Sequence, residues 1–421
     1  IRLRMQVPQR EGGAFDVDAD VRLQGRELPV QGGVQALLPR MSGHVVGSWH
    51  FSSLAWVPGM FNAPPWLELE GAGDLRADLR IEDGRPVPGS HVELPDVAAS
   101  ARVMDSRISG RGRVRADLGL SGSGMLQTRL AVQLDGYSIA AQATPSTPYA
   151  KGDSLQLDVS IDGLPTREAA LGATTAHLRF TDAVVPDLRV YNRFLSGEMR
   201  IEGGSGLASA DLRLDGGGNI GQGTVQVTGR DAGMYMAGRR LHGDIVLDTR
   251  LEQGDLARRQ LDLDGSQVRL RDVSFVDRDG ASRHDWWATV DLPRARIDMG
   301  APYSVSGEFA VQARDVGFLI DLFGSARGYP QWIDRIVDSG QARASGRVHW
   351  QGDTLVLDQV KAFNDRYQVM ARLRAADGRR DGQLFAQWGV LSAGVDLRGG
   401  QKDVRLIGAR QWFESQPALL H

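Results

Sequence analysis

A period of two in the apolar residues constrains the fold of this chain more than any other feature. Between glycine-rich turns, apolar residues occupy every second position, as in residues 155–161 (LQLDVSI) and 267–271 (QVRLR). Successive side chains of a β-strand point to opposite faces, so this pattern puts apolar side chains on one face and Arg, Asp, Gln and Ser on the other. The pattern predicts an antiparallel sheet, with roughly half of the chain in strands, above the usual share of about a quarter.

Glycine residues mark the turns between these segments. The chain has 52 glycines among 421 residues, an excess over the usual share of about 7%. Asp-Gly pairs favour tight hairpins because both residues tolerate positive φ. We expect turns at the eight Asp-Gly pairs, which begin at Asp83, Asp135, Asp162, Asp215, Asp264, Asp279, Asp377 and Asp381.

Helical patterns are short and few. The candidate helices are residues 54–61, 166–171, 186–195, 316–323, 331–337 and 409–415. Helices this few cannot cover a sheet of the expected size.

One segment of the chain recurs within it. Residues 71–81 (GAGDLRADLRI) return as residues 204–214 (GSGLASADLRL), and a looser third copy lies at 340–350. In each copy a candidate helix precedes a glycine-rich entry and an amphipathic strand. Recurrence of one unit predicts a sheet that grows by addition. We therefore expect one continuous repetitive β-region over 1–421, with repeat-like units at about 54–150, 186–300 and 316–421.

Composition excludes several classes of protein. The formal net charge of −3 argues against a nucleic-acid binder, which usually carries a basic excess. The chain has no cysteine, so disulfide scaffolds, thiolate zinc sites and thiol catalysis are excluded. No run of about 18 apolar residues occurs, so we expect any signal peptide or membrane anchor to lie upstream of Ile1.

The segments that resemble catalytic or cofactor motifs are better explained as structure. Residues 216–221 (GGGNIG) have the spacing of a dinucleotide fingerprint, but a strand pattern follows where that motif needs a helix. The eight histidines form no i, i+2 or i, i+4 pair, so a local metal site is not supported. Residues 284–287 (HDWW) fit a carbohydrate-stacking or catalytic patch, but an aromatic anchor at a strand end is the favoured interpretation.

The carboxylates alternate with arginines along the strands, which predicts cross-strand ion-pair ladders on a solvated face. Paired catalytic acids cannot be distinguished in such a background. We therefore expect neither an enzyme, nor a cofactor, nor a bound metal.

The apolar face of the sheet needs a cover, which can be helices, a second sheet, closure of the sheet on itself or a bound apolar ligand. Helices are too few, and a sandwich of two sheets is the structural alternative. A groove that holds lipid is the favoured interpretation, because removing a chain of about 16 methylenes from water recovers roughly 13 kcal/mol. The candidate lining positions are Leu75, Leu79, Ile81, Leu155, Leu157, Val159, Ile161, Leu212, Leu214, Val225, Val227, Val268, Leu270, Val348, Trp350, Leu355 and Leu357.

Two modules of the chain resemble the AsmA-like family of β-groove lipid-transfer proteins. The first runs from residues 314–323 (RDVGFLIDLF) through 329–333 (YPQWI) to 345–348 (SGRV), and the second joins residues 180–188 (FTDAVVPDL) to Tyr191 and Asn192. In that family a segment of this kind precedes a glycine-rich strand pair.

The resemblance implies a fold, a place and a function. The implied fold is all-β: an elongated, twisted, mainly antiparallel sheet curled into a U-shaped groove (a β-taco) with a few short helices. The implied protein lies in the periplasm of Gram-negative bacteria, anchored in the inner membrane by an N-terminal helix. There it is expected to bind phospholipid or another acyl lipid for transport to the outer membrane, where it meets an outer-membrane partner.

Two other functions stay open at this point. The same strands closed into β-sandwiches would suit a structural or outer-membrane assembly factor without lipid cargo. The third hypothesis is a glycan-active β-solenoid enzyme or lectin. Such a protein needs aromatic platforms for sugar binding, and the scattered tryptophans do not supply them.

Overall fold

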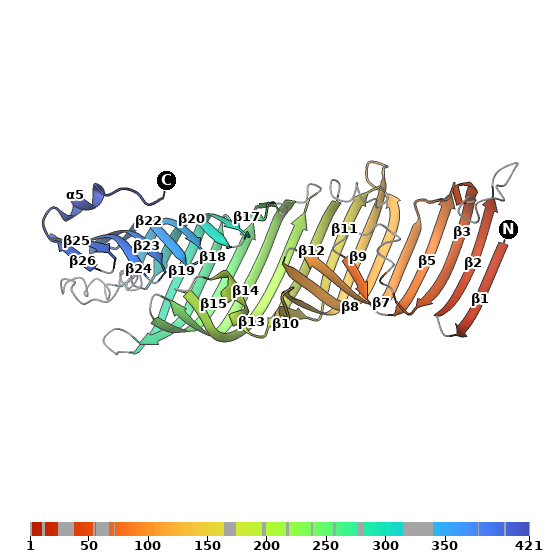
Figure 1. Ribbon diagram of the computed structural model, residues 1–421, viewed down its shortest axis with the longest axis horizontal. Coiled ribbons are helices and arrows are strands. Elements are labelled where there is room, and N and C mark those ends of the chain that lie inside the picture. Colours follow the sequence, from red (N-terminus) through yellow and green to blue (C-terminus); the bar gives the residue numbers. More distant parts are fainter. Residues whose placement is uncertain are drawn as a thin grey trace. The chain divides into compact units, whose positions relative to one another are not determined.

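The computed structural model places most of its described residues in antiparallel strands, and these residues also include one short α-helix and two 3-10 turns (Figure 1). It describes the chain except residues 1, 11–12, 24–37, 54, 56–66, 71, 104, 164–173, 196–198, 216–218, 237–238, 256–257, 277–281, 301, 315–339, 378, 400 and 421. The predicted all-β class with a curved antiparallel sheet is confirmed, and the strand content exceeds the predicted half.

The chain divides into two compact units. Unit 1 comprises Ile1–Ala183 and Ala210–Asn219, and unit 2 comprises Val184–Ser209 and Ile220–His421. The three repeat-like units expected from the sequence stay a prediction.

Unit 1 is an antiparallel meander. Its elements are β1 (Arg2–Arg10), β2 (Gly13–Leu23), η1 (Leu38–Arg40), β3 (Met41–Phe51), β4 (Leu67–Glu70), β5 (Gly73–Glu82), β6 (Arg85–Pro86), β7 (Ser90–Val103), β8 (Ser106–Leu120), β9 (Leu126–Ala141), β10 (Thr144–Gly152), β11 (Leu155–Asp162) and most of β12 (Thr174–Val185). The main order of pairing is β1–β2–β3–β5–β7–β8–β9–β11–β12. Strand β13 (Met199–Leu214) contributes residues to both units.

Unit 2 continues the same pattern of pairing between strands that are close in sequence. Its elements are η2 (Leu188–Phe194), β14 (Asn219–Met236), β15 (Arg239–Leu251), β16 (Gln253–Asp255), β17 (Gln260–Asp262), β18 (Ser266–Val276), β19 (Ser282–Asp298), β20 (Ser304–Ala313), β21 (Ala342–Gln351), β22 (Thr354–Phe363), β23 (Tyr367–Ala376), β24 (Arg379–Trp388), β25 (Leu391–Arg398), β26 (Gln401–Arg405) and α5 (Ala409–Glu414). The main order is β14–β15–β18–β19–β20–β21–β22–β23–β24–β25–β26.

Bulges interrupt most of the long strands near their middles. In unit 1 the register shifts between Leu94 and Val97 of β7 and between Gly110 and Gly112 of β8. In unit 2 such shifts recur in β14, β15, β18, β19, β21 and β22. Because a bulge bends its strand and increases the local twist, shifts on adjacent strands bend the sheet.

Long strands also change partners along their length. The first half of β7 pairs with β5, and its second half pairs with β4. Likewise, β9 pairs with β11 before Asp135 and with β10 after Gly136. The bends are therefore places where one strand spans two shorter neighbours.

Two of the Asp-Gly predictions are wrong. Asp135-Gly136 lies inside β9 and Asp381-Gly382 lies inside β24, so neither pair forms a hairpin turn. Gly136 lies where the register of β9 shifts. Its φ is +104, a value that glycine adopts readily and residues with a Cβ rarely do. The pair at Asp83, with φ +46 and +73, does form the turn between β5 and β6.

Of the candidate helices, the structure tests two. Residues 186–195 contain η2, and residues 409–415 contain α5. The candidates at 54–61, 166–171, 316–323 and 331–337 lie essentially outside the described residues. A strand, β14, follows the glycine-rich residues 216–218, as the hairpin interpretation predicts.

Candidate functional site

The apolar positions of unit 1 line up from strand to strand. Leu75 of β5 pairs with Trp49 of β3, and Leu79 pairs with Val45. Across β9, β11 and β12, one row joins Val132, Leu157 and Leu178, and the next joins Leu130, Val159 and Ala176. Because partners in register point to the same face, these side chains form one apolar surface.

Unit 2 carries a corresponding apolar surface. Its longest row crosses ten strands in register, through Val227, Leu247, Val268, Val290, Val311, Ala344, Ala362, Val369, Ala386 and Ala393. A second row joins Val305, Trp350 and Leu355. The alternation in the sequence thus becomes a continuous stripe in each unit.

The predicted lining residues fall into two groups by exposure. Seven are buried, namely Leu75, Leu155, Val159, Ile161, Leu270, Leu355 and Leu357. Ten are half-buried, namely Leu79, Ile81, Leu157, Leu212, Leu214, Val225, Val227, Val268, Val348 and Trp350. All seventeen lie in described strands, and their role as groove lining stays a prediction.

The prediction omitted other members of these rows. Val45, Leu130, Leu247, Val290 and Val311 pair in register with predicted lining residues or with one another. Their own segments alternate as clearly as those selected, as in residues 128–134 (TRLAVQL). The alternation of apolar residues, applied to every segment of the chain, identifies these five positions as well.

The apolar face of the last strands of unit 2 is buried. Buried residues of β21–β25 form one cluster, which comprises Ala342, Leu355, Leu357, Val360, Ala362, Tyr367, Val369, Ala371, Leu373, Ala375, Leu384, Ala386, Ala393, Val395 and Leu397. Phe309, Val348, Trp350, Trp388 and Val404 pack against it. In this stretch Leu355 and Leu357 are core residues, and their role as groove lining stays a prediction.

The opposite face of the same strands is covered by the end of the chain. Ala409 and Phe413 of α5 pack against Met370 and Phe385, which alternate with residues of the first cluster. Gly394 of β25 makes room for Trp412, because a Cβ there would lie 2.8 Å from the indole ring.

The side chains of Asp358 and Arg372 hold the segment that follows α5. Asp358 is fully buried, and its Oδ2 accepts hydrogen bonds from the backbone N–H groups of Leu419 (3.1 Å) and Leu420 (3.0 Å). Arg372 Nη1 donates to the carbonyl oxygens of Phe413 (3.1 Å) and Gln416 (2.7 Å). Arg372 Nε lies 3.6 Å from Asp358 Oδ1, so the two side chains also form an ion pair.

The polar face consists of cross-strand ion pairs, as the sequence predicts. Asp96 and Arg111 lie at neighbouring bulges of β7 and β8 and form two hydrogen bonds of 2.6 Å. The hydrogen bond from Arg111 holds the pKa of Asp96 below its usual value. Histidines take part as well: His44 lies 2.6 Å from Asp78, and His177 lies 2.7 Å from Asp211. These contacts are those of a solvated ladder.

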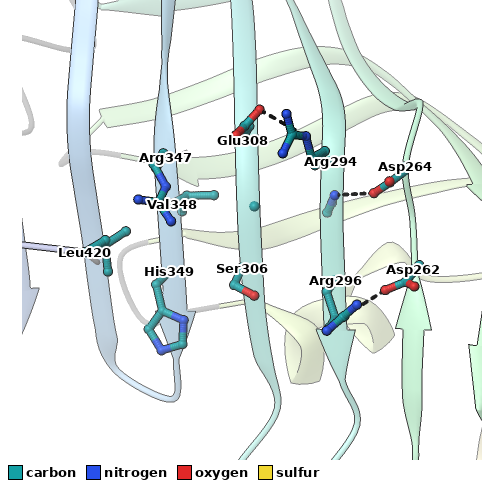
Figure 2. Close-up of a pocket in the computed structure, with 12 residues that line it drawn as sticks. Asp262, Asp264, Arg294, Arg296, Ser306, Glu308, Arg347, Val348, His349 and Leu420 are labelled. Atoms are coloured by element: carbon teal, nitrogen blue, oxygen red, sulfur yellow. Dashed lines mark hydrogen bonds and ion pairs between the residues drawn. The ribbon is translucent and has the colours of Figure 1, made fainter.

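Figure 2 shows a pocket of about 460 Å³ beside this polar ladder in unit 2. It is lined by Asp262, Asp264, Arg294, Ala295, Arg296, Ser306, Gly307, Glu308, Arg347, Val348, His349 and Leu420. Arg296 pairs with Asp262 at 2.8 Å and Arg294 with Glu308 at 3.6 Å, while Asp264 accepts a hydrogen bond from the Ala295 N–H. Its charges are largely paired with one another, and Val348 is the one predicted groove-lining residue among its lining side chains.

The remaining motif of the sequence is structural. Trp286 in the HDWW segment is buried and packs edge-on against Phe275, with ring centroids 6.2 Å apart. Arg314 Nη1 donates to the carbonyl oxygens of His284 (3.1 Å) and Asp285 (2.9 Å). The segment therefore anchors the start of β19.

A buried tyrosine lies at the bend of β9. Tyr137 packs against Phe180, and its hydroxyl is buried without a hydrogen-bond partner. Burial, together with the charge of Asp153, raises the pKa of Tyr137 to about 12. A Cβ on Gly152 would lie 2.6 Å from this hydroxyl, so glycine is required beside it.

Within the described strands and turns, no group of three or more His, Cys, Asp or Glu side chains is placed to hold a metal ion. A helix long and apolar enough to cross a bilayer is likewise not found in the part of the chain that the structure describes. No family model, curated protein or solved structure matches this chain.

Proposed function

We propose that this protein binds lipid in the periplasm, where the apolar face of its sheet holds phospholipid acyl chains during transport from the inner to the outer membrane. The observation that carries the proposal is the row of half-buried aliphatic side chains that crosses β14–β21 in register. In this proposal the protein carries out no catalysis and needs no cofactor.

The physical case rests on the incomplete burial of that row. Val227, Leu247 and Val268 are each only half-buried, although they belong to one contiguous apolar surface. Every 100 Å² of such surface removed from water stabilises the covered state by about 2.5 kcal/mol. An acyl chain is flexible, long and uniformly apolar, so it can cover such a row along its length.

The polar face fits the same role. Its arginines and carboxylates pair across the strands, for example Arg269 with Asp248 and Arg296 with Asp262. This face keeps the sheet in water while the other face takes up lipid. The periplasmic location, the inner-membrane anchor in the full-length protein and an outer-membrane partner are parts of the proposal that follow from the resemblance to the AsmA-like family.

Lipid uptake by the delipidated 421-residue protein tests the proposal. We expect radiolabelled phospholipid to stay with the protein through gel filtration. Leu212→Asp should reduce the bound lipid several-fold, because the charge enters the apolar face, whereas Arg213→Asp on the opposite face of β13 should not. Absence of bound lipid in the parent protein, or equal losses in the two variants, would count against the proposal.

One observation favours a second candidate function. The apolar face of β21–β25 is buried within the protein, as the structural or assembly-factor alternative predicts. If the whole protein worked in this way, native mass spectrometry of freshly purified protein would show the mass of the polypeptide alone.

A further inference from the structure

The ends of strands β22–β26 carry an unusual set of exposed apolar side chains. They are Phe363 (50% exposed), Val390 (99%), Leu391 (50%), Leu406 (61%) and Ile407 (94%), and we call this set the apolar rim. Among all described residues, Val390 and Ile407 are the most exposed large hydrophobic side chains.

The register brings the apolar rim to one edge of the sheet. Trp388 pairs with Leu391 across the β24–β25 turn, and Gly394 pairs with Arg405. Leu406 and Ile407 therefore leave β26 beside the start of β25. Phe363 pairs with Gln368, which pairs in turn with Gln387, so the end of β22 reaches the same edge.

The turn between β24 and β25 does not itself require an apolar residue. Gly389 has φ +57, which supplies the positive φ that a two-residue hairpin needs at its first position. Its second residue, Val390, lies at the tip. At the opposite ends of these strands the turns carry polar residues, namely Asp353 between β21 and β22 and Asp377 between β23 and β24.

Basic side chains surround the apolar rim. Its segments, residues 361–367, 387–392 and 403–410, contain Lys361, Arg366, Arg405 and Arg410 but only two carboxylates, Asp365 and Asp403. All six side chains are exposed. Arg405 pairs with Asp403 at 3.6 Å and Arg410 pairs with Glu414 at 3.0 Å, so the positive excess is small and comes from Lys361 and Arg366. Exposed apolar tips flanked by a basic excess match the surface of an anionic bilayer, where apolar groups enter the interface and cations meet phosphates.

We propose that the apolar rim docks onto an anionic lipid bilayer, with Val390 and Ile407 inserted below the phosphates. This contact is distinct from the retention of lipid along the apolar face. Docking depends on side chains at the strand ends, whereas retention depends on the half-buried row that crosses β14–β21. Directly behind it, the buried cluster of β21–β25 and helix α5 give these turns a rigid support. A second copy of the chain or a protein partner fits less well, because the apolar tips project individually and form no concave pocket that the structure describes.

Vesicle flotation with the full chain tests the proposal. The probe is vesicles of phosphatidylcholine with about a third phosphatidylglycerol. We expect the parent protein to float with these vesicles, and the Val390→Ser, Ile407→Ser double variant to lose at least about tenfold in affinity. The matched control is Leu120→Ser with Met125→Ser, which removes two exposed apolar side chains near another turn and should bind like the parent.

Three outcomes would overturn the docking proposal. The parent protein could fail to float, the double variant could float like the parent, or binding could be lost together with a dimer seen by analytical ultracentrifugation, which would identify a second copy as the occupant. Lipid retention along the apolar face, measured on the same variants, should stay at the level of the parent. If the parent protein retained no lipid along the apolar face, the proposed function would be refuted. The flotation experiment would still test the docking proposal.

Discussion

Strands β14–β21 and β22–β26 of unit 2 share one sequence pattern but differ in how their apolar faces are covered. In β14–β20 the row contains Val227, Leu247, Val268, Val290 and Val311, all of them half-buried. In β22–β25 the corresponding positions alternate between large and small residues and form a closed cluster.

Small residues occur in both regions. Ala362, Ala371, Ala386 and Ala393 occur among Leu373, Leu384 and Val395 in the cluster, so large side chains from one strand fit beside small ones from the next. In β18–β20 the row next to the valines holds Leu270, Ala288 and Ala313, which are buried. The comparison teaches that alternation predicts which face is apolar, but not how far each position on that face is buried.

The largest expected effect separates the two regions by stability. Leu384→Ala in the closed cluster removes a side chain that is 1% exposed, and should lower the free energy of unfolding by about 2–5 kcal/mol. Leu247→Ala in the half-buried row should cost about 1 kcal/mol, because its methyl groups are only partly removed from water. Urea unfolding followed by tryptophan fluorescence measures both, and equal losses would remove the distinction between the regions.

The next effect tests what holds the closed region from its other face. Asp358→Ala removes the acceptor of the Leu419 and Leu420 N–H groups and leaves Arg372 without its buried partner. The expected loss of stability is about 3 kcal/mol. Limited proteolysis should then cut the chain after β26, and Asp353→Ala, at an exposed turn, serves as the control. Resistance equal to the parent would show that Asp358 does not hold this segment.

Much of this comparison could be read from the sequence, and part of it could not. The alternation in residues 155–161 and 267–271 predicts the strands and assigns Leu157 and Val268 to the apolar face. The bulges were not visible, because a bulge is defined by the strand beside it: Asp135-Gly136 looks like a hairpin turn and lies within β9. The pairing of Asp358 with residues 61 and 62 positions later is equally long-range, and no local pattern indicates it.

A smaller effect concerns the open region alone. Replacing Val227, Val268 and Val290 together with serine should reduce retention of phospholipid about tenfold, equivalent to about 1.4 kcal/mol, because the row loses apolar surface. The matched control replaces Gln226, Gln267 and Thr289, their neighbours on the polar face, with serine. The amount of co-purified phospholipid in each variant is measured by extraction and mass spectrometry. Equal loss of phospholipid in both triple variants would contradict the prediction.

The smallest effect tests local closure at a bend of unit 1. The pKa of Tyr137 is raised to about 12, so the folded protein keeps this proton while the unfolded chain releases it near pH 10. Stability should therefore decline slightly as the pH rises from 10 towards 12. Tyr137→Phe should remove this decline and leave the melting temperature at neutral pH unchanged or higher, because no hydrogen bond is lost. A lower melting temperature would show that the hydroxyl has a partner.

Site-specific photo-crosslinking compares the faces and the regions in one experiment. A benzophenone amino acid placed at Val268, on the half-buried row, should yield adducts with the mass of phospholipid when the full protein is irradiated in cells. The same group at Arg269, on the opposite face of β18, or at Arg374, an exposed position of β23 at the strand end away from the apolar rim, should yield none. Lipid adducts at Val268 alone would support a lipid-filled face, whereas no adduct at Val268, or equal adducts at all three positions, would contradict it.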